Sequence, residues 1–214
     1  MHASLPTIER SLQTGDLLLF SGKGFASAGI KWLLGSTWSH VGLVVRPAGH
    51  DARPLLWEAT PCTDLVDVIT GRPAGGARLV SLHARLDTFP GAVAVRRLSK
   101  RLDALQRARF ARVLRQLHGR PYEKRWLELL LAVSERIDLS RENLTTLFCS
   151  ELVAETYQRI GLLDDVAQGG LPSNEYTPRH FSAAHDLPLR QGFALDPEVR
   201  LDRVGMAPEM ALAA

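Results

Sequence analysis

Short apolar runs separated by turn-forming residues predict several strands in the first half of the chain. The segments Gly15–Phe20, Ser39–Val45 and Leu55–Ala59 are apolar or rich in β-branched residues. Because the turn-forming stretch Pro47–Pro54 separates the last two, we expect them to pair as an antiparallel hairpin. Further strands are predicted at Leu65–Ile69, Ala77–Leu82 and Ala92–Leu98.

Apolar positions spaced by three or four residues predict helices elsewhere. One of them should begin at Cys149, where an extended apolar approach ends, and should finish near Gly161. Its apolar stripe consists of Leu152, Val153, Tyr157 and Ile160. The other predicted helices cover Ser21–Gly35, Lys100–His118, Glu123–Ile137 and a short piece of Pro178–His185.

The length and composition of the chain predict one domain. A chain of 214 residues with 45% hydrophobic content can bury one substantial core. We expect this domain to cover residues 1–198, followed by a flexible tail at 199–214. The first residues do not resemble a signal peptide, and the longest apolar stretch, Leu127–Val133, is too short to span a bilayer, so a cytoplasmic location is expected.

Positive charge gathers in one part of the chain. The formal net charge is +3, and most of the excess lies between Arg96 and Arg125. The helix Lys100–His118 could contact an anionic surface, or its arginines could simply face solvent. Nucleic-acid binding is not expected, because aromatic residues do not alternate with the basic ones and no known nucleic-acid module is present.

Cys149 is the first candidate for chemistry. At the start of a helix, free N–H groups and the helix dipole favour the thiolate, which is the nucleophilic form of cysteine. The alternative is a buried, inert thiol, since free cysteine is among the most buried residue types. The only other cysteine, Cys62, has no evident role and is interpreted as a spectator. Two distant cysteines cannot form a disulfide framework or a cysteine-rich zinc site.

A cysteine nucleophile needs a base, and the base needs a third group that orients it. Of the seven histidines, His40 is the one at the head of a predicted strand. On the neighbouring strand, Glu58 is an acidic residue within an apolar segment, where it could accept a proton from the His40 ring. Alternatively, His40 is a structural strand residue and Glu58 faces outward.

These segments together resemble a known family. Gly15-Asp16 precedes an early strand, Ser39-His40-Val41-Gly42 begins the next, and the segment Phe148–Val153 (FCSELV) comes late. This pattern is similar to the circularly permuted branch of the NlpC/P60 papain-like superfamily, the YaeF/YiiX-like amidases, and more distantly to lecithin:retinol acyltransferases. The order of histidine, acid and cysteine is that of a permuted papain-like site. The resemblance covers residues 15–176 and implies an α+β fold in which an antiparallel sheet packs against helices and the nucleophile sits at a helix N-terminus.

The resemblance also implies roles for individual residues. Cys149 would be the nucleophile, His40 the general base and Glu58 the orienting group. Tyr122 corresponds to a tyrosine that would line the pocket, although it could equally anchor a loop. Ser39 and Ser150, which adjoin His40 and Cys149 in the chain, complete the substrate-binding candidates. No cofactor is implied, and a metal site is disfavoured because the sequence has no His-Glu-x-x-His pattern and His180 and His185 are five residues apart.

The leading hypothesis is therefore a cysteine hydrolase of the amidase or peptidase type that acts on a peptide, an acyl-amide or a lipid-like small substrate. A thioesterase or a lipid acyltransferase would use the same covalent step. A non-catalytic binding module on the same fold is the third alternative. Many relatives carry a secretion or lipoprotein signal that this chain does not show, which argues against a cell-wall substrate. The sequence does not indicate the oligomeric state.

Overall fold

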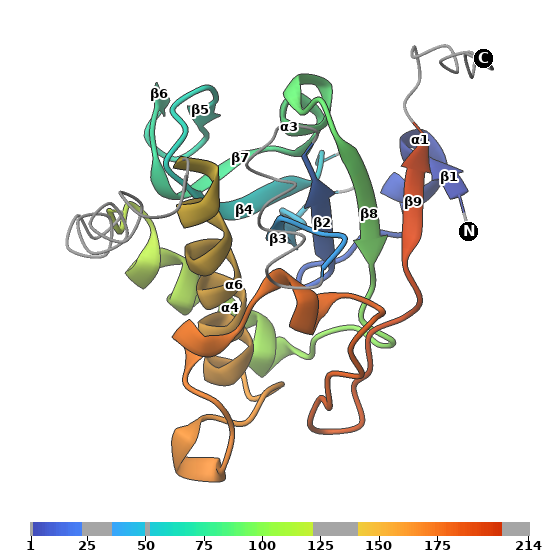
Figure 1. Cartoon of the computed structure of the whole chain (residues 1–214), viewed down its shortest axis with the longest axis vertical. Coiled ribbons are helices and arrows are strands. Elements are labelled where there is room, and N and C mark those ends of the chain that lie inside the picture. Colours follow the sequence, from blue (N-terminus) through green and yellow to red (C-terminus); the bar gives the residue numbers. More distant parts are fainter. Residues whose placement is uncertain (1, 23–35, 50–51, 122–140, 203–214) are drawn as a thin grey trace, which may run out of the picture.

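The computed structural model describes residues 2–22, 36–49, 52–121 and 141–202 and has an α+β architecture (Figure 1). Its main element is a seven-stranded sheet in the order β1-β9-β8-β2-β3-β4-β7. All neighbouring strands are antiparallel except β1 and β9, which pair in parallel. The strands are β1 His2–Ser4, β2 Leu17–Ser21, β3 His40–Val45, β4 Leu55–Thr60, β7 Gly76–Ser81, β8 Ala92–Arg96 and β9 Val199–Asp202. A small hairpin, β5 Val66–Asp67 and β6 Arg72–Pro73, stands apart.

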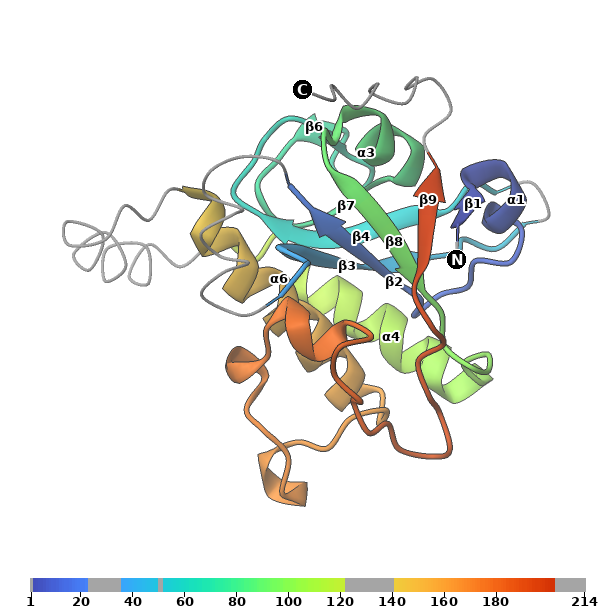
Figure 2. The same ribbon diagram turned by 45° about the vertical axis from the view of Figure 1, so that its right-hand side comes forward.

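Helices cover the two faces of this sheet (Figure 2). One face carries α4 (Ala104–Leu117) and α6 (Arg141–Arg159), and the other carries α3 (Leu82–Thr88) with the short α1 (Leu5–Glu9) near its edge. Three single-turn helices, η1 Val166–Gln168, η2 Ser173–Glu175 and η3 Pro178–Phe181, follow α6. Among the described residues, no helix has both the length and the apolar character needed to cross a membrane.

Strand alternation divides the core into two layers. On β3, Val41 and Leu43 face the α4 and α6 layer, whereas Val44 faces the layer of α1 and α3. On β4, Trp57 faces the α4 and α6 layer and Leu56 faces the layer of α1 and α3. Because successive side chains of a strand point to opposite faces, His40 and Glu58 belong with Val44 and Leu56 on the α3 side.

The sequence located the strands of the first half well. The predicted segments at 15–20, 39–45, 55–59, 77–82 and 92–98 correspond to β2, β3, β4, β7 and β8 within one to two residues at each end. The expected hairpin is present, since β3 and β4 pair antiparallel with Leu43 opposite Trp57. The predicted strand at 65–69 is reduced to the two-residue β5, and β1 was not predicted. Residues 199–202 form β9 rather than part of a flexible tail.

The helices were predicted less well. The helix expected at 100–118 is α4, which begins at Ala104 behind a capping box made by Asp103 and Gln106. The helix that carries Cys149 begins at Arg141, so the prediction of a helix start at Cys149 was wrong. A short apolar run cannot be assigned to strand or helix by periodicity alone, which explains the error. The helix expected at 123–137 lies outside the described residues, and so does the helix expected at 21–35 except for its first two positions, of which Ser21 ends β2.

Asp16 fixes the start of β2 to the end of β8. Its carboxylate accepts hydrogen bonds from the backbone N–H groups of Leu98, at 2.9 Å, and Gln13, at 2.8 Å. The carboxyl is almost fully buried, and this burial raises its pKa to about 6 against the two hydrogen bonds that favour the charged form. At neutral pH, ionised Asp16 therefore lowers the free energy of unfolding.

This raised pKa predicts how Asp16 contributes to stability. Since the folded pKa of about 6 exceeds the ordinary value of 3.8, the contribution of Asp16 is present at acid pH and is lost as pH rises through 6. The free energy of unfolding of Asp16→Asn, relative to wild type, should rise by about 2 kcal/mol between pH 4 and pH 7. Urea unfolding of both proteins at the two pH values measures this. A difference that stays constant with pH would contradict the prediction.

Candidate active site

His40 and Glu58 form a buried pair between β3 and β4. His40 Nε2 lies 2.8 Å from Glu58 Oε2, and the glutamate side chain has no exposed surface. The pairing of β3 with β4 ends at Leu43 and Trp57, so the pair lies just beyond the last matched residues. The contact that the sequence predicted between these two side chains is present.

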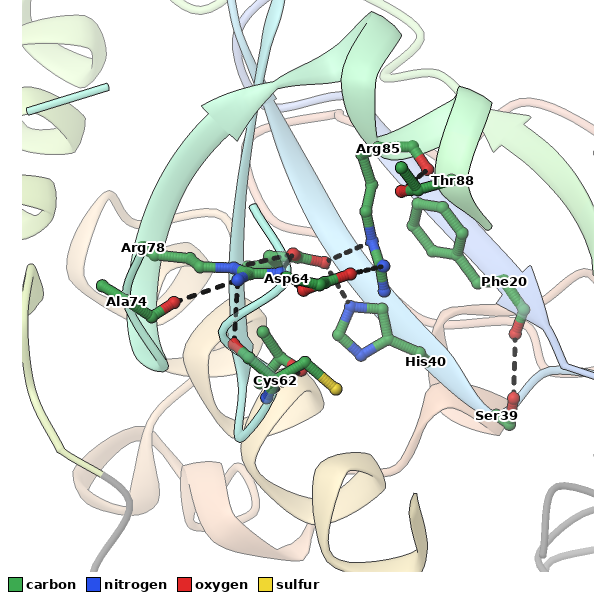
Figure 3. A network of polar contacts seen from close by, with 11 residues as sticks. Phe20, Ser39, His40, Cys62, Asp64, Ala74, Arg78, Arg85 and Thr88 are labelled. Carbon is green, nitrogen blue, oxygen red and sulfur yellow. Dashed lines mark hydrogen bonds and ion pairs between the residues drawn. The ribbon is translucent and has the colours of Figure 1, made fainter. Parts of the chain in front are cut away.

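Two arginines complete the environment of the carboxylate (Figure 3). Arg78 on β7 lies directly opposite Glu58 in the strand register and donates from Nη2 at 2.8 Å and Nε at 3.1 Å to Oε1. Arg85 on α3 donates from Nε to Oε2 at 3.1 Å. Asp64 contacts both guanidinium groups, at 2.9 Å from Arg78 Nη2 and 3.6 Å from Arg85 Nη1. The site is thus a compact cluster of two carboxylates, two guanidiniums and one imidazole.

The cluster sets the charge state of its members. Burial alone would raise the pKa of Glu58, but the positive charge of Arg85, the hydrogen bond to His40 and the charge of Arg78 together hold it well below its usual range. Burial lowers the pKa of His40, and the charges of Arg85 and Arg78 add to this against the opposing effect of Glu58. At neutral pH the carboxylate is therefore ionised and the imidazole is uncharged.

The second ring nitrogen of His40 is the exceptional atom of this site. An ionised carboxylate only accepts hydrogen bonds, so the neutral imidazole must carry its proton on Nε2, facing Glu58. Nδ1 is then an acceptor. It is buried and has no hydrogen-bond partner among the described residues. Because buried polar atoms are nearly always paired, a free basic nitrogen held in place by a fixed tautomer indicates a functional position.

Cys149 approaches this region from the other face of the sheet. It lies in the middle of α6, is fully buried and belongs to the core layer that includes Val41. Burial raises the pKa of its thiol to about 12, although hydrogen bonding from the N–H groups of Val41 and Ser150 acts in the opposite direction. The charge of Glu58 contributes a further increase, which places the thiol within electrostatic range of the cluster. The expectation of a thiolate activated at a helix N-terminus was wrong.

The other predicted site residues have different surroundings. Ser150 is fully buried and donates to the carbonyl oxygen of Tyr176 at 2.6 Å, so it offers no surface to a substrate. Ser39 is also buried; it donates to the Phe20 carbonyl at 3.3 Å and accepts from the N–H of Gly22 at 3.2 Å. Tyr122 lies outside the described residues.

Residues next to the cluster were missed or undervalued by the sequence interpretation. Arg78 and Arg85 were not proposed, although a charge inside the apolar strand at 76–81 was the same signal that identified Glu58. Cys62 is exposed, and its carbonyl oxygen accepts from Arg78 Nη1 at 2.8 Å. The backbone of Cys62 therefore supports the cluster while its thiol stays free.

Comparison with known proteins shows similarity to solved structures. No protein-family model and no curated protein matches the chain. A solved structure described as the metalloprotein YiiX from Escherichia coli O157:H7 (DUF1105) is 23% identical, with a TM-score of 0.45. The match covers 68% of this chain and 64% of that one, which is less than two thirds of its length. In the described part of this chain, no group of three or more His, Cys, Asp or Glu residues is arranged to hold a metal ion.

The cluster predicts a large stability effect for Glu58. Replacing Glu58 with Gln leaves two buried guanidiniums short of a countercharge, which typically costs about 3–5 kcal/mol of unfolding free energy. Since the folded pKa of Glu58 lies below its ordinary value of 4.5, this contribution is present above pH 4.5 and is lost as pH falls below it. Urea unfolding at pH 7 and at pH 3 measures both effects.

The matched control is Glu9→Gln, which removes a partly exposed carboxylate 3.0 Å from His83 Nε2. This change should cost about 1 kcal/mol or less. Equal losses in the two variants would show that the Glu58 cluster contributes no more than a surface ion pair.

Proposed function

We propose that the protein is a cysteine hydrolase in which Cys149 attacks an acyl carbonyl and His40 accepts the thiol proton at Nδ1. The observation that carries this proposal is the buried His40–Glu58 pair, in which Nε2 contacts the carboxylate and Nδ1 has no partner among the residues that the structure describes. A base with one nitrogen fixed by a carboxylate and the other free is the arrangement that nucleophilic catalysis requires. The resemblance of the His40 and Cys149 segments to permuted papain-like amidases agrees with it.

The proposed reaction proceeds from a neutral resting pair. With the thiol pKa near 12 and the His40 pKa lowered, proton transfer from sulfur to Nδ1 accompanies attack on the carbonyl. The acyl group is then held as a thioester on Cys149, and the imidazolium returns its proton to the leaving group. His40 next activates a water that cleaves the thioester and releases the acid. Cys149 is fully buried in the layer of α4 and α6, whereas His40 lies on the α3 side of the sheet, so substrate binding has to uncover the sulfur and bring it within reach of Nδ1 before attack.

The chain offers a simple test because it contains only two cysteines. Cys62→Ala leaves Cys149 as the sole thiol, and Cys149→Ala leaves Cys62. We expect activated acyl esters and acyl anilides to give a covalent acyl adduct in the Cys62→Ala protein and none in the Cys149→Ala protein, as measured by intact mass and peptide mapping. An adduct confined to Cys62 would overturn the assignment of the nucleophile.

The role of His40 has its own test. His40→Gln should abolish adduct formation by the Cys62→Ala protein, whereas His83→Gln, which alters a partly exposed histidine paired with Glu9, should not. For wild-type protein, kcat/KM should fall as pH drops through the pKa of His40, which burial places below 6.5. An acid limb centred above pH 6.5, or activity retained by His40→Gln, would contradict the assigned base.

One observation favours a second candidate, a transferase that passes the acyl group to a lipid amine or hydroxyl. Arg109, Arg112 and Arg115 on α4 are exposed and form no ion pair with any residue that the structure describes. Such a basic helix is attracted to anionic membrane surfaces. Adding vesicles with anionic lipids and acceptor amines to the ester assay distinguishes the two: a hydrolase releases free acid, and a transferase releases acylated lipid or amine.

A non-catalytic binding module remains the third candidate, and the buried thiol with its raised pKa favours it. A module would give no acyl adduct on either cysteine with any ester or anilide. Simple alkylation does not separate these candidates, because a protonated, buried Cys149 should react more slowly than exposed Cys62 in both.

A further inference from the structure

Each of the two Glu58 carboxylate oxygens accepts two hydrogen bonds. Oε1 receives two hydrogen bonds from Arg78, and Oε2 receives one from Arg85 and one from His40. All four donors lie between 2.8 and 3.1 Å, and the carboxylate has no exposed surface. The orientation of the His40 ring thus depends on a carboxylate whose position is set mainly by the two arginines.

Arg85 is also linked to His40 through the aromatic ring of Phe20. Its guanidinium carbon lies 5.4 Å from the Phe20 ring centroid and 5.3 Å from that of Phe89, so the group packs beside this pair of aromatic rings, whose own centroids are 5.1 Å apart. Phe20 in turn packs against the His40 ring, with centroids 5.4 Å apart. Arg85 is therefore held in place independently of the ion pair. Figure 3 shows Arg85, Phe20 and His40 gathered on the same side of the sheet.

The charges around His40 come from every element packed against it. Within the described part of the chain, Glu58 on β4 is the carboxylate in direct contact with His40, and Arg78 on β7 and Arg85 on α3 carry the opposing charge. Asp64, which is 43% exposed, supplies a second negative charge on the outer side of both guanidiniums. From α6 the thiol of Cys149 is within electrostatic range of Glu58. Among the four charged groups named here, two anions and two cations balance, so Glu58 does not act on His40 as an uncompensated charge.

We propose that Arg85, together with Arg78, is a positioning residue that holds His40 as the neutral Nε2–H tautomer by immobilising and neutralising Glu58. A histidine beside an uncompensated carboxylate is protonated more readily, and an imidazolium has no lone pair with which to take a proton. The arginines prevent this and keep Nδ1 unprotonated at neutral pH, so that it can accept a proton. For catalysis the proposal rests on His40 being the base, but the tautomer and charge of His40 can be measured without any activity.

Arg85 is the better of the two arginines for a test. Arg78 is fully buried and also donates to the carbonyl oxygens of Cys62 and Ala74, at 2.8 and 2.9 Å, so its removal disturbs the backbone. Arg85 contacts only the two carboxylates and the two aromatic rings among the polar and aromatic groups described. Arg85→Gln removes the charge, and Arg85→Lys retains it without the planar fork.

The experiment is a histidine-detected ¹H–¹⁵N NMR titration of the folded protein from pH 5 to 8.5, with the His40 signals assigned by their loss in His40→Gln. Wild-type His40 should appear as the Nε2–H tautomer and should titrate below its ordinary pKa of 6.5. In Arg85→Gln its titration should move upward by about one pH unit, since a nearby charge shifts a pKa by about 1–3 units. Arg85→Lys should recover most of this shift.

Two further variants test whether a shifted His40 titration reflects charge rather than a general loss of structure. Asp64→Asn removes a partly exposed negative charge, so it should move the His40 titration in the opposite direction, downward, and by a smaller amount. Arg96→Gln removes another buried arginine, whose hydrogen bonds to described residues all go to the carbonyl oxygens of Phe181, Ser182 and Asp196. This variant should lower stability and leave the His40 titration unchanged.

The results separate this inference from the proposed function. An Nδ1–H tautomer in wild type, or a His40 titration that does not move in Arg85→Gln and Asp64→Asn, would overturn the role of the arginines whatever the activity. Failure to form an acyl adduct at Cys149 would overturn the hydrolase and leave the NMR result standing. If the protein is a hydrolase, the acid limb of kcat/KM in Arg85→Gln should move upward by the same amount as the titration.

Discussion

The carboxylate of Glu58 is the group on which the centre of this fold depends. A buried charge of this kind is tolerated only when oppositely charged groups and hydrogen bonds surround it, and here three other elements of the chain supply them. Arg78 comes from the neighbouring strand, Arg85 from the helix that follows it, and His40 from the strand on the other side. The need to satisfy one carboxylate therefore fixes the relative positions of β3, β4, β7 and α3.

The same arrangement explains how a buried histidine can stay neutral and keep one ring nitrogen able to accept a proton. Desolvation keeps the imidazole neutral, while the hydrogen bond to Glu58 determines which nitrogen carries the proton. Without the arginines, Glu58 would either attract a proton to the imidazole or take one up itself. The cluster thus separates two effects of a carboxylate on a histidine, retaining the orientation of the ring and suppressing its protonation.

The parts of this site that the sequence predicted are those that follow from local patterns. A hairpin of two short strands, with a histidine at the start of one and a glutamate inside the other, places both side chains on one face by alternation alone. Arg78 could have been found by the same reasoning, because it is a charged residue in an apolar strand, but its position opposite Glu58 depends on the pairing of β4 with β7. Cys149 was assigned to a helix start because a short apolar run is compatible with either a strand or a helix. Strands β1 and β9 pair residues from the two ends of the sequence, which no local pattern indicates.

The parallel pairing of β1 with β9 affects how the protein is made. His2 aligns with Arg200, so β1 has no partner until almost the entire described chain has been synthesised. The carboxylate cluster, in contrast, draws only on residues 40–85, and its members can meet while synthesis continues. During that interval β8 presents an open edge that only β9 later covers, and an open edge can pair with another chain. Nascent chains of this protein should therefore be most prone to aggregation after the carboxylate cluster has formed and before β9 has been synthesised.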